Sequence, residues 1–127
     1  MKLRIKGNSL RLRVSRSEMN RFSMGQTIQE TIQFGPDPDA RLTYALEWNA
    51  AINQTTGKYD SHTITVQIPS ELARSWVESD LVGLSGSTDL GSAGTLEILV
   101  EKDFACLDQS DADNEDTFPN SNIRVAC

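Results

Sequence analysis

Apolar and polar residues alternate along several short stretches of this chain, and a period of two is typical of half-buried β-strands. Most of the predicted strands have apolar residues at even spacing, and the strands are Lys2–Lys6, Leu10–Val14, Ile28–Phe34, Arg41–Trp48, His62–Ile68, Leu81–Leu84 and Leu96–Val100. The segment Gly7–Ser9 has turn chemistry and predicts a hairpin between the first two strands. A helix is the alternative for the fourth strand, because Tyr44–Ala51 contains good helix formers.

Two short helices are predicted from their start signals. Ser15 and Glu18 have the spacing of a capping box, in which each side chain bonds to the backbone N–H of the other residue. Gly25 is placed to end this helix in a left-handed turn. Pro69 opens the second helix, because its missing N–H has no partner in a first helical turn anyway. The buried stripe of that helix is predicted to be Leu72, Ala73, Trp76 and Val77.

Polar and glycine-rich segments predict the loops between these elements. They are Gly35–Asp39, Asn53–Ser61 and Gly86–Gly94. The last segment contains no lysine and no strand-to-helix context, both of which a phosphate-binding loop requires. A flexible hairpin is therefore predicted there.

The chain resembles itself when it is shifted by 54 positions. Phe22 then meets Trp76 and Leu46 meets Val100. Of the 15 hydrophobic residues between positions 10 and 48, 10 meet a hydrophobic partner. The overall composition would give about six by chance. We predict two pseudo-repeated halves, at about residues 9–49 and 62–103, with one additional strand before the first half.

The predicted fold class is α+β and β-rich, with a small barrel-like sheet built from the two strand–helix–strand–hairpin halves. A length of 127 residues with a 38% hydrophobic share suits one domain. We expect a single globular domain at residues 1–107 and an acidic C-terminal tail at residues 108–127. The first residues contain no uninterrupted apolar run, so neither a secretory signal nor a membrane span is predicted, and we expect a cytoplasmic protein.

The stretch TVQIPSELARSWVESDLVGLSGSTDLGSAGTLEILV, Thr65–Val100, resembles the swapped-hairpin β-barrel unit of AbrB- and MazE-type regulators and antitoxins. The similarity extends loosely through Leu10–Leu46, and the family's Gly-Asp is Ser79-Asp80 here. In that family two such units interlock in one barrel. The resemblance implies that this chain holds both units in tandem, with DNA binding as an expected activity of the class.

A second resemblance involves both ends of the chain. The segments MKLRIKGNSLRLR, EKDFACL and EDTFPN are similar to those of an uncharacterised family of small bacterial proteins. This resemblance implies a bacterial origin and no known activity.

Basic residues gather near the N-terminus, although the net charge of the chain is −6. The candidate nucleic-acid-binding residues share the first hairpin, and they are Arg4, Lys6, Arg11 and Arg13. The alternative is that they only form the solvent face of two strands. No aromatic residue lies between them to stack on bases, and the net charge repels phosphate, so we do not expect nucleic acid as the main partner.

Candidates for chemistry are few. His62 and Cys106 could form a base–nucleophile pair only if the fold brought them together. With Cys127 they lack the close ligand pairs of a zinc site. Asp111, Asp113 and Glu115 alternate as oxygen ligands do at the start of a calcium loop, although Asp116 replaces the glycine of that loop. They are the candidate metal ligands, and a solvated acidic tail is the alternative.

We predict no catalytic residues and no cofactor, and we expect an interaction or adaptor protein that binds another protein or itself. The alternatives are an AbrB-like DNA-binding regulator and a protein that binds a small ligand or metal through its acidic C-terminal segment. Two cysteines are too few for a disulfide scaffold in a domain of this size, so thiols are expected in a reducing compartment, and a bridge between Cys106 and Cys127 is the alternative.

Overall fold

The computed structural model describes residues 1–104 and 116–119, and it contains two four-stranded sheets and two α-helices. The strands are β1 Lys2–Lys6, β2 Ser9–Val14, β3 Ile28–Gln33, β4 Arg41–Asn49, β5 Thr56–Asp60, β6 Thr63–Pro69, β7 Gly83–Asp89 and β8 Thr95–Lys102. The helices are α1 Arg16–Ser23 and α2 Ser70–Glu78, with a short 3₁₀ turn at Gly91–Ala93. The prediction of a β-rich α+β fold is confirmed, and the strand is the correct choice for Arg41–Asn49.

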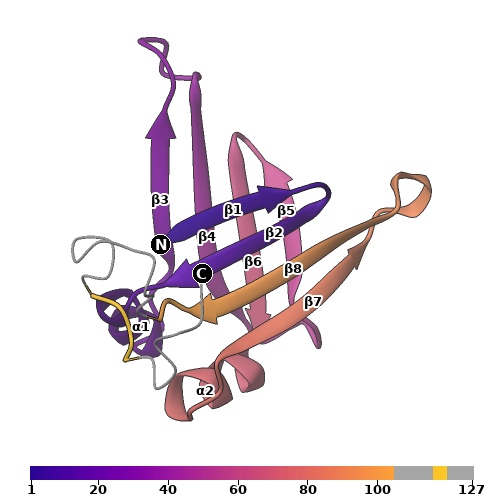
Figure 1. Ribbon diagram of the computed structural model, residues 1–127. Helices are drawn as coiled ribbons and strands as arrows, with labels where there is room; N and C mark the ends of the chain where they lie inside the picture. Colours follow the sequence, from indigo (N-terminus) through magenta and orange to yellow (C-terminus); the bar gives the residue numbers. More distant parts are fainter. Residues whose placement is uncertain (105–115, 120–127) are drawn as a thin grey trace.

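Each sheet joins strands from both halves of the sequence. Sheet A has the order β1-β2-β8-β7 and sheet B the order β3-β4-β6-β5. In both sheets the central pair is parallel, β2 with β8 and β4 with β6, and the outer pairs are antiparallel. The strands of sheet A cross in front of those of sheet B, and both helices lie at one end of the molecule (Figure 1).

The predicted barrel-like sheet is wrong, because the eight strands form two open sheets. The edge strands are β1 and β7 in sheet A and β3 and β5 in sheet B. Where an edge of one sheet lies near an edge of the other, the contacts are not a ladder of backbone hydrogen bonds. The amino group of Met1, next to β1, donates to Glu30 in β3, and the backbone N–H of Gly57 in β5 donates to Thr88 Oγ1 in β7 at 3.1 Å. Side-chain contacts of this kind join the sheets without closing them into one.

The two sheets have equivalent strand pairing at an offset of 54. Leu12 pairs with Val100 across β2 and β8, and Val66 pairs with Leu46 across β6 and β4. The order β1-β2-α1-β3-β4 is followed by β5-β6-α2-β7-β8. Strand β5 is therefore the counterpart of β1, which means that the strand predicted as an addition to the first half has an equivalent in the second.

Strand β5 lies in a segment predicted as a loop, so that prediction is wrong. The predicted hairpin is present, since β7 and β8 pair antiparallel, but β7 extends into its predicted loop. Both edge strands lack apolar alternation because they pack closely at a glycine. A Cβ atom at Gly86 would lie 2.3 Å from the backbone oxygen of Thr55. One at Gly57 would lie 3.0 Å from side-chain atoms of Leu96 and Ile98. Close approach of the two sheets therefore selects small residues and removes the apolar alternation that marks a strand.

Local sequence determines how both helices begin and how α1 ends. The predicted capping box is present, with the Ser15 side chain accepting from the N–H of Glu18 and Glu18 accepting from the N–H of Ser15. Gly25 has a φ of 86° and its N–H donates to the Phe22 oxygen at 2.9 Å, which closes the helix as predicted. Pro69 is the N-cap of α2, one residue earlier than its predicted place in the first turn.

Three aromatic side chains from different elements meet at the centre of the core. The ring of Phe22 in α1 lies 5.2 Å from that of Trp48 in β4 and 5.8 Å from that of Trp76 in α2, measured between centroids. Phe22 and Trp76 are fully buried. Each indole N–H donates to a backbone oxygen, so burial leaves neither polar group unsatisfied. This cluster links the two helices to sheet B.

The segment Asp116–Pro119, within the range predicted as a tail, contacts the main body of the protein. Phe118 forms a parallel bridge with Phe104, and its N–H donates to the Asp103 oxygen at 2.7 Å. Asp116 accepts hydrogen bonds from the backbone N–H and the hydroxyl of Ser17 at the start of α1. The hydrogen bonds from Ser17 hold the pKa of Asp116 below its usual range. The carboxylate therefore supplies acceptors to a helix N-terminus.

Glu18 has a second role beyond the capping box. Its Oε2 accepts from the amino group of Met1 at 2.5 Å, and that amino group also donates to Glu30 at 2.7 Å. Burial by itself raises the pKa of Glu18, but the hydrogen bonds from the Met1 amino group and from Ser15 outweigh it and lower the pKa. The ionised form of Glu18 is thus favoured by folding.

We expect the Glu18→Gln variant to lose about 1–3 kcal/mol of unfolding free energy at pH 7. A pKa that is lower in the folded state stabilises the protein above the unfolded pKa, and this contribution disappears as the pH falls through the folded pKa. The difference between wild type and variant should therefore shrink between pH 7 and acidic pH. Urea denaturation at several pH values measures it. Glu71→Gln, an exposed carboxylate in the first turn of α2, is the matched control, and a pH-independent difference would contradict this reasoning.

Candidate functional site

The outward face of sheet A carries most of the basic side chains of the N-terminal hairpin. Strand pairing places Arg4 opposite Arg11, Lys6 opposite Ser9, and Lys2 opposite Arg13. These residues alternate with the apolar residues of β1 and β2, which point to the opposite face. We define the basic face as Lys2, Arg4, Lys6, Arg11 and Arg13. The structure therefore brings together the four residues that the sequence nominated.

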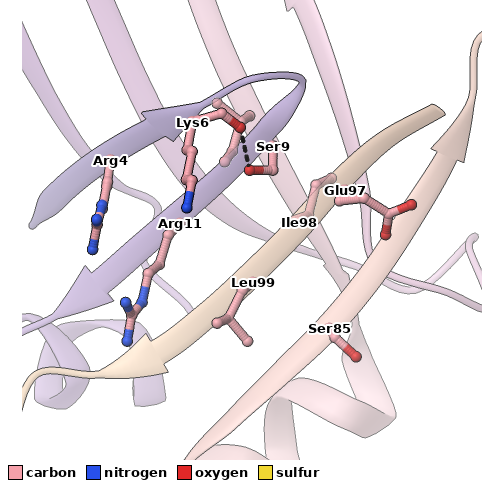
Figure 2. A pocket seen from close by; sticks show the side chains of 9 residues that line it. Arg4, Lys6, Ser9, Arg11, Ser85, Glu97, Ile98 and Leu99 are labelled. Atoms are coloured by element: carbon pink, nitrogen blue, oxygen red, sulfur yellow. Dashed lines mark hydrogen bonds between the residues drawn. The ribbon is translucent and has the colours of Figure 1, made fainter. Parts of the chain in front are cut away.

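A hollow of about 460 Å³ lies on this face. Figure 2 shows Arg4 and Lys6 from β1 beside Arg11 from β2, with Leu99 of β8 next to them and Ser85 of β7 at the far side. Register explains the arrangement, because Arg11 pairs with Leu99, and Leu99 pairs with Ser85. The hollow thus combines cationic walls with an apolar floor.

The cations of the basic face differ in their partners. Arg11 Nε donates to Glu101 Oε1 at 2.5 Å, and Arg13 Nε donates to the same oxygen at 3.1 Å. Lys2 pairs with the buried carboxylate of Asp103 at 2.9 Å. Within residues 1–104 and 116–119, neither Arg4 nor Lys6 forms an ion pair, and both are exposed. These two side chains are available to an anionic group from outside the chain.

The outward face of sheet B carries charges of both signs, because register places Glu47, Lys58 and Asp60 on it. The hydroxyls of Thr31 and Thr43 on this face lie 2.7 Å apart and bond to each other. The contrast makes the basic face of sheet A the better candidate for recognition.

The other residues nominated from the sequence do not form a site within the described chain. His62 lies in the tight turn between β5 and β6, where Ser61 and His62 have φ of 51° and 63°. Cys106, Cys127 and the candidate metal ligands Asp111, Asp113 and Glu115 lie outside the described residues. Within the described residues, no three His, Cys, Asp or Glu side chains are grouped as a metal ion requires.

Sequence reasoning missed the residues that complete the hollow. Leu99, Ser85 and Glu97 come from β7 and β8, more than seventy positions after the hairpin. Leu99 breaks the strand's alternation, since Leu96, Ile98 and Val100 occupy the inward positions. An apolar residue at an outward position was the one available signal.

Fold and site define a two-sheet α+β protein with a basic sheet face. The chain belongs to DUF7009, a family of unknown function, whose family model matches residues 1–122. Membership in an uncharacterised family, as the sequence resemblance implied, is thus confirmed. Comparison with curated proteins and with solved structures gives no match. A search of the described residues finds no helix with the length and hydrophobicity needed to cross a membrane.

Proposed function

We propose that this protein is a non-enzymatic interaction module that binds an acidic segment of a partner protein on the basic face of sheet A. One observation carries the proposal: Arg4 and Lys6 stand over an apolar floor in a 460 Å³ hollow and have no ion-pair partner among the described residues. An extended peptide with a carboxylate and an apolar side chain two positions apart satisfies both features, because side chains at positions i and i+2 lie on the same face of the peptide.

Charge favours a peptide over a polynucleotide. Glu97 lies in the hollow, and Glu101 pairs with both Arg11 and Arg13 and offsets one of their two charges, so the positive region is short. The net charge of −6 opposes the long-range approach of a phosphate backbone. The hollow contains no aromatic side chain on which a base would stack. The proposal assumes a bacterial cytoplasm, where a reducing environment keeps cysteines as thiols.

We expect Arg4→Glu to weaken binding of an extended peptide with Glu and Leu two positions apart, called here the Glu-Leu peptide, by about tenfold, because charge reversal replaces attraction with repulsion at the hollow. Fluorescence anisotropy of the labelled peptide at low ionic strength measures the affinity. Arg74→Glu is the matched control, since it makes the same change of charge at an exposed position of α2. Both variants should keep the wild-type melting temperature.

Three outcomes would overturn the proposal. One is equal binding of the Glu-Leu peptide and a Lys-Leu peptide, because charge would then play no part. Another is an equal effect of Arg4→Glu and Arg74→Glu, which would show a general charge effect. The third is binding of random duplex DNA without binding of the acidic peptide, which would favour the regulator suggested by the AbrB-like resemblance.

A further inference from the structure

Lys102 is the buried lysine of the described chain. It is the last residue of β8 and is 8% exposed, whereas Lys2, Lys6 and Lys58 are exposed. It continues the inward row formed by Ile98 and Val100, so alternation along the strand turns its side chain toward the interior. Lysine is rarely buried unless its ammonium is paired, and its position therefore requires an explanation.

The Lys102 amine donates a hydrogen bond to the backbone oxygen of Ser79 at 2.7 Å. Ser79 is the C-cap of α2, where the last carbonyl groups of the helix need donors. This hydrogen bond uses one N–H of the amine. A neutral amine that keeps this bond still has a lone pair for reaction.

The side chain of Lys102 also lines a pocket of about 430 Å³. The pocket walls are mostly apolar, and they are formed by Asp80, Val82, Phe104, Phe118 and Pro119. The rings of Phe104 and Phe118 lie 5.9 Å apart, and the Lys102 nitrogen lies 5.8 Å from the centre of the Phe118 ring. An amine, a carboxyl group and two aromatic rings therefore share one small space.

Burial changes the protonation of this amine. Desolvation lowers the pKa of Lys102, and the charge of Asp80 opposes the shift without cancelling it. At a given pH a larger fraction of Lys102 is therefore neutral than of an exposed lysine. The neutral amine is the nucleophilic form, and apolar surroundings are a known means of activating lysine.

We propose that Lys102 is a covalent binding site for a small apolar carbonyl compound of the aromatic aldehyde class. The nitrogen lone pair attacks the carbonyl carbon, a C–N bond forms, and the C=O π electrons move to oxygen. Transfer of a proton from nitrogen to oxygen gives a carbinolamine, and loss of water gives the imine C=N. No oxidant or reductant takes part. Phe104 and Phe118 hold the ring of the aldehyde, and Asp80 lines the same pocket as a carboxyl group that can relay the proton.

Reductive trapping tests the proposal. The full-length protein is treated with benzaldehyde and sodium cyanoborohydride near neutral pH, and peptide mapping by mass spectrometry follows each lysine. Lys102 should be labelled at least about tenfold faster than Lys58, because burial lowers the pKa of its amine and the apolar pocket walls hold the aldehyde beside it. The ratio of Lys102 to Lys58 labelling rates should fall as the pH approaches the pKa of an exposed lysine. In denaturing guanidinium the two lysines should be labelled at equal rates.

Further comparisons separate the pocket from simple amine reactivity. Glycolaldehyde, a small polar aldehyde, should show a smaller ratio of Lys102 to Lys58 labelling than benzaldehyde. Phe118→Leu should reduce that ratio for benzaldehyde while leaving Lys58 unchanged. Lys102→Arg keeps a cationic donor for the Ser79 oxygen and should abolish labelling at position 102 only. Equal labelling of Lys102 and Lys58, or equal ratios for the two aldehydes, would overturn the proposal.

Discussion

Replacement of Phe22 by alanine is expected to lower the free energy of unfolding by about 3–5 kcal/mol. Phe22 is fully buried, and its ring contacts both Trp48 and Trp76. The change removes apolar area and leaves a cavity between two rigid indoles, each anchored by its own hydrogen bond, which limits collapse. The loss is a large part of the total stability of a domain, which is about 5–15 kcal/mol.

Met24→Ala is the matched control for this experiment, because Met24 caps the same helix and is 68% exposed. It should change stability by less than about 0.5 kcal/mol. Urea denaturation followed by circular dichroism measures both variants. Tryptophan fluorescence gives a second measurement, since both tryptophans of the chain touch Phe22. A loss for Phe22→Ala no larger than that for Met24→Ala would show that the aromatic cluster does not hold the two helices to sheet B.

Gly86→Ala is expected to destabilise the protein by about 1–3 kcal/mol, although alanine is otherwise the better residue in a strand. Its Cβ would lie 2.3 Å from the oxygen and 2.8 Å from the Cβ of Thr55. The oxygen belongs to the backbone and cannot rotate away, so β5 and β7 must separate. Hydrogen exchange of the Gly57 N–H, which donates to Thr88 across the same junction, should become faster.

Alanine substitution of two other glycines should give smaller losses of stability than Gly86→Ala. Gly57→Ala should cost less than Gly86→Ala, because the atoms it meets at 3.0 Å are the side-chain ends of Leu96 and Ile98, which can shift. Gly35→Ala should be nearly neutral, since its Cβ would make an ordinary 3.6 Å contact with Ala40. Thermal denaturation of the three variants gives the order. Equal stability of Gly86→Ala and Gly35→Ala would refute the close approach of the sheets at Thr55.

Local signals in the sequence predicted those elements whose form depends on neighbouring residues. The capping box of Ser15 and Glu18 and the left-handed end at Gly25 are confirmed because each involves residues only a few positions apart. Strand β4 is likewise confirmed, since alternation along Arg41–Asn49 reflects a buried face. Edge strand β5 was missed, and β7 was predicted only at its first residues, within Leu81–Leu84, because the contact between these strands joins Thr55 to Gly86, thirty-one positions apart.

The candidate site also combines features that nearby residues determine with features that depend on contacts between distant strands. Alternation placed Arg4, Lys6, Arg11 and Arg13 on one face of a hairpin, and that convergence could be predicted from the residues alone. The sequence did not show which of these cations form ion pairs, because Glu101 lies beside Arg11 and Arg13 only through the parallel pairing of β2 with β8. Nor did it show that Leu99 supplies an apolar floor.

The sequence by itself determined the helix caps, most strands and the basic character of the first hairpin, because short-range hydrogen bonding and the two-residue period act within single elements. Only the tertiary structure decided that the strands form two open sheets, that Arg4 and Lys6 stay unpaired within the described chain while Arg11 and Arg13 do not, and that Lys102 is buried beside Phe118. The physical reason is that charge neutralisation and burial depend on which distant strand lies alongside, and periodicity contains no information about that choice.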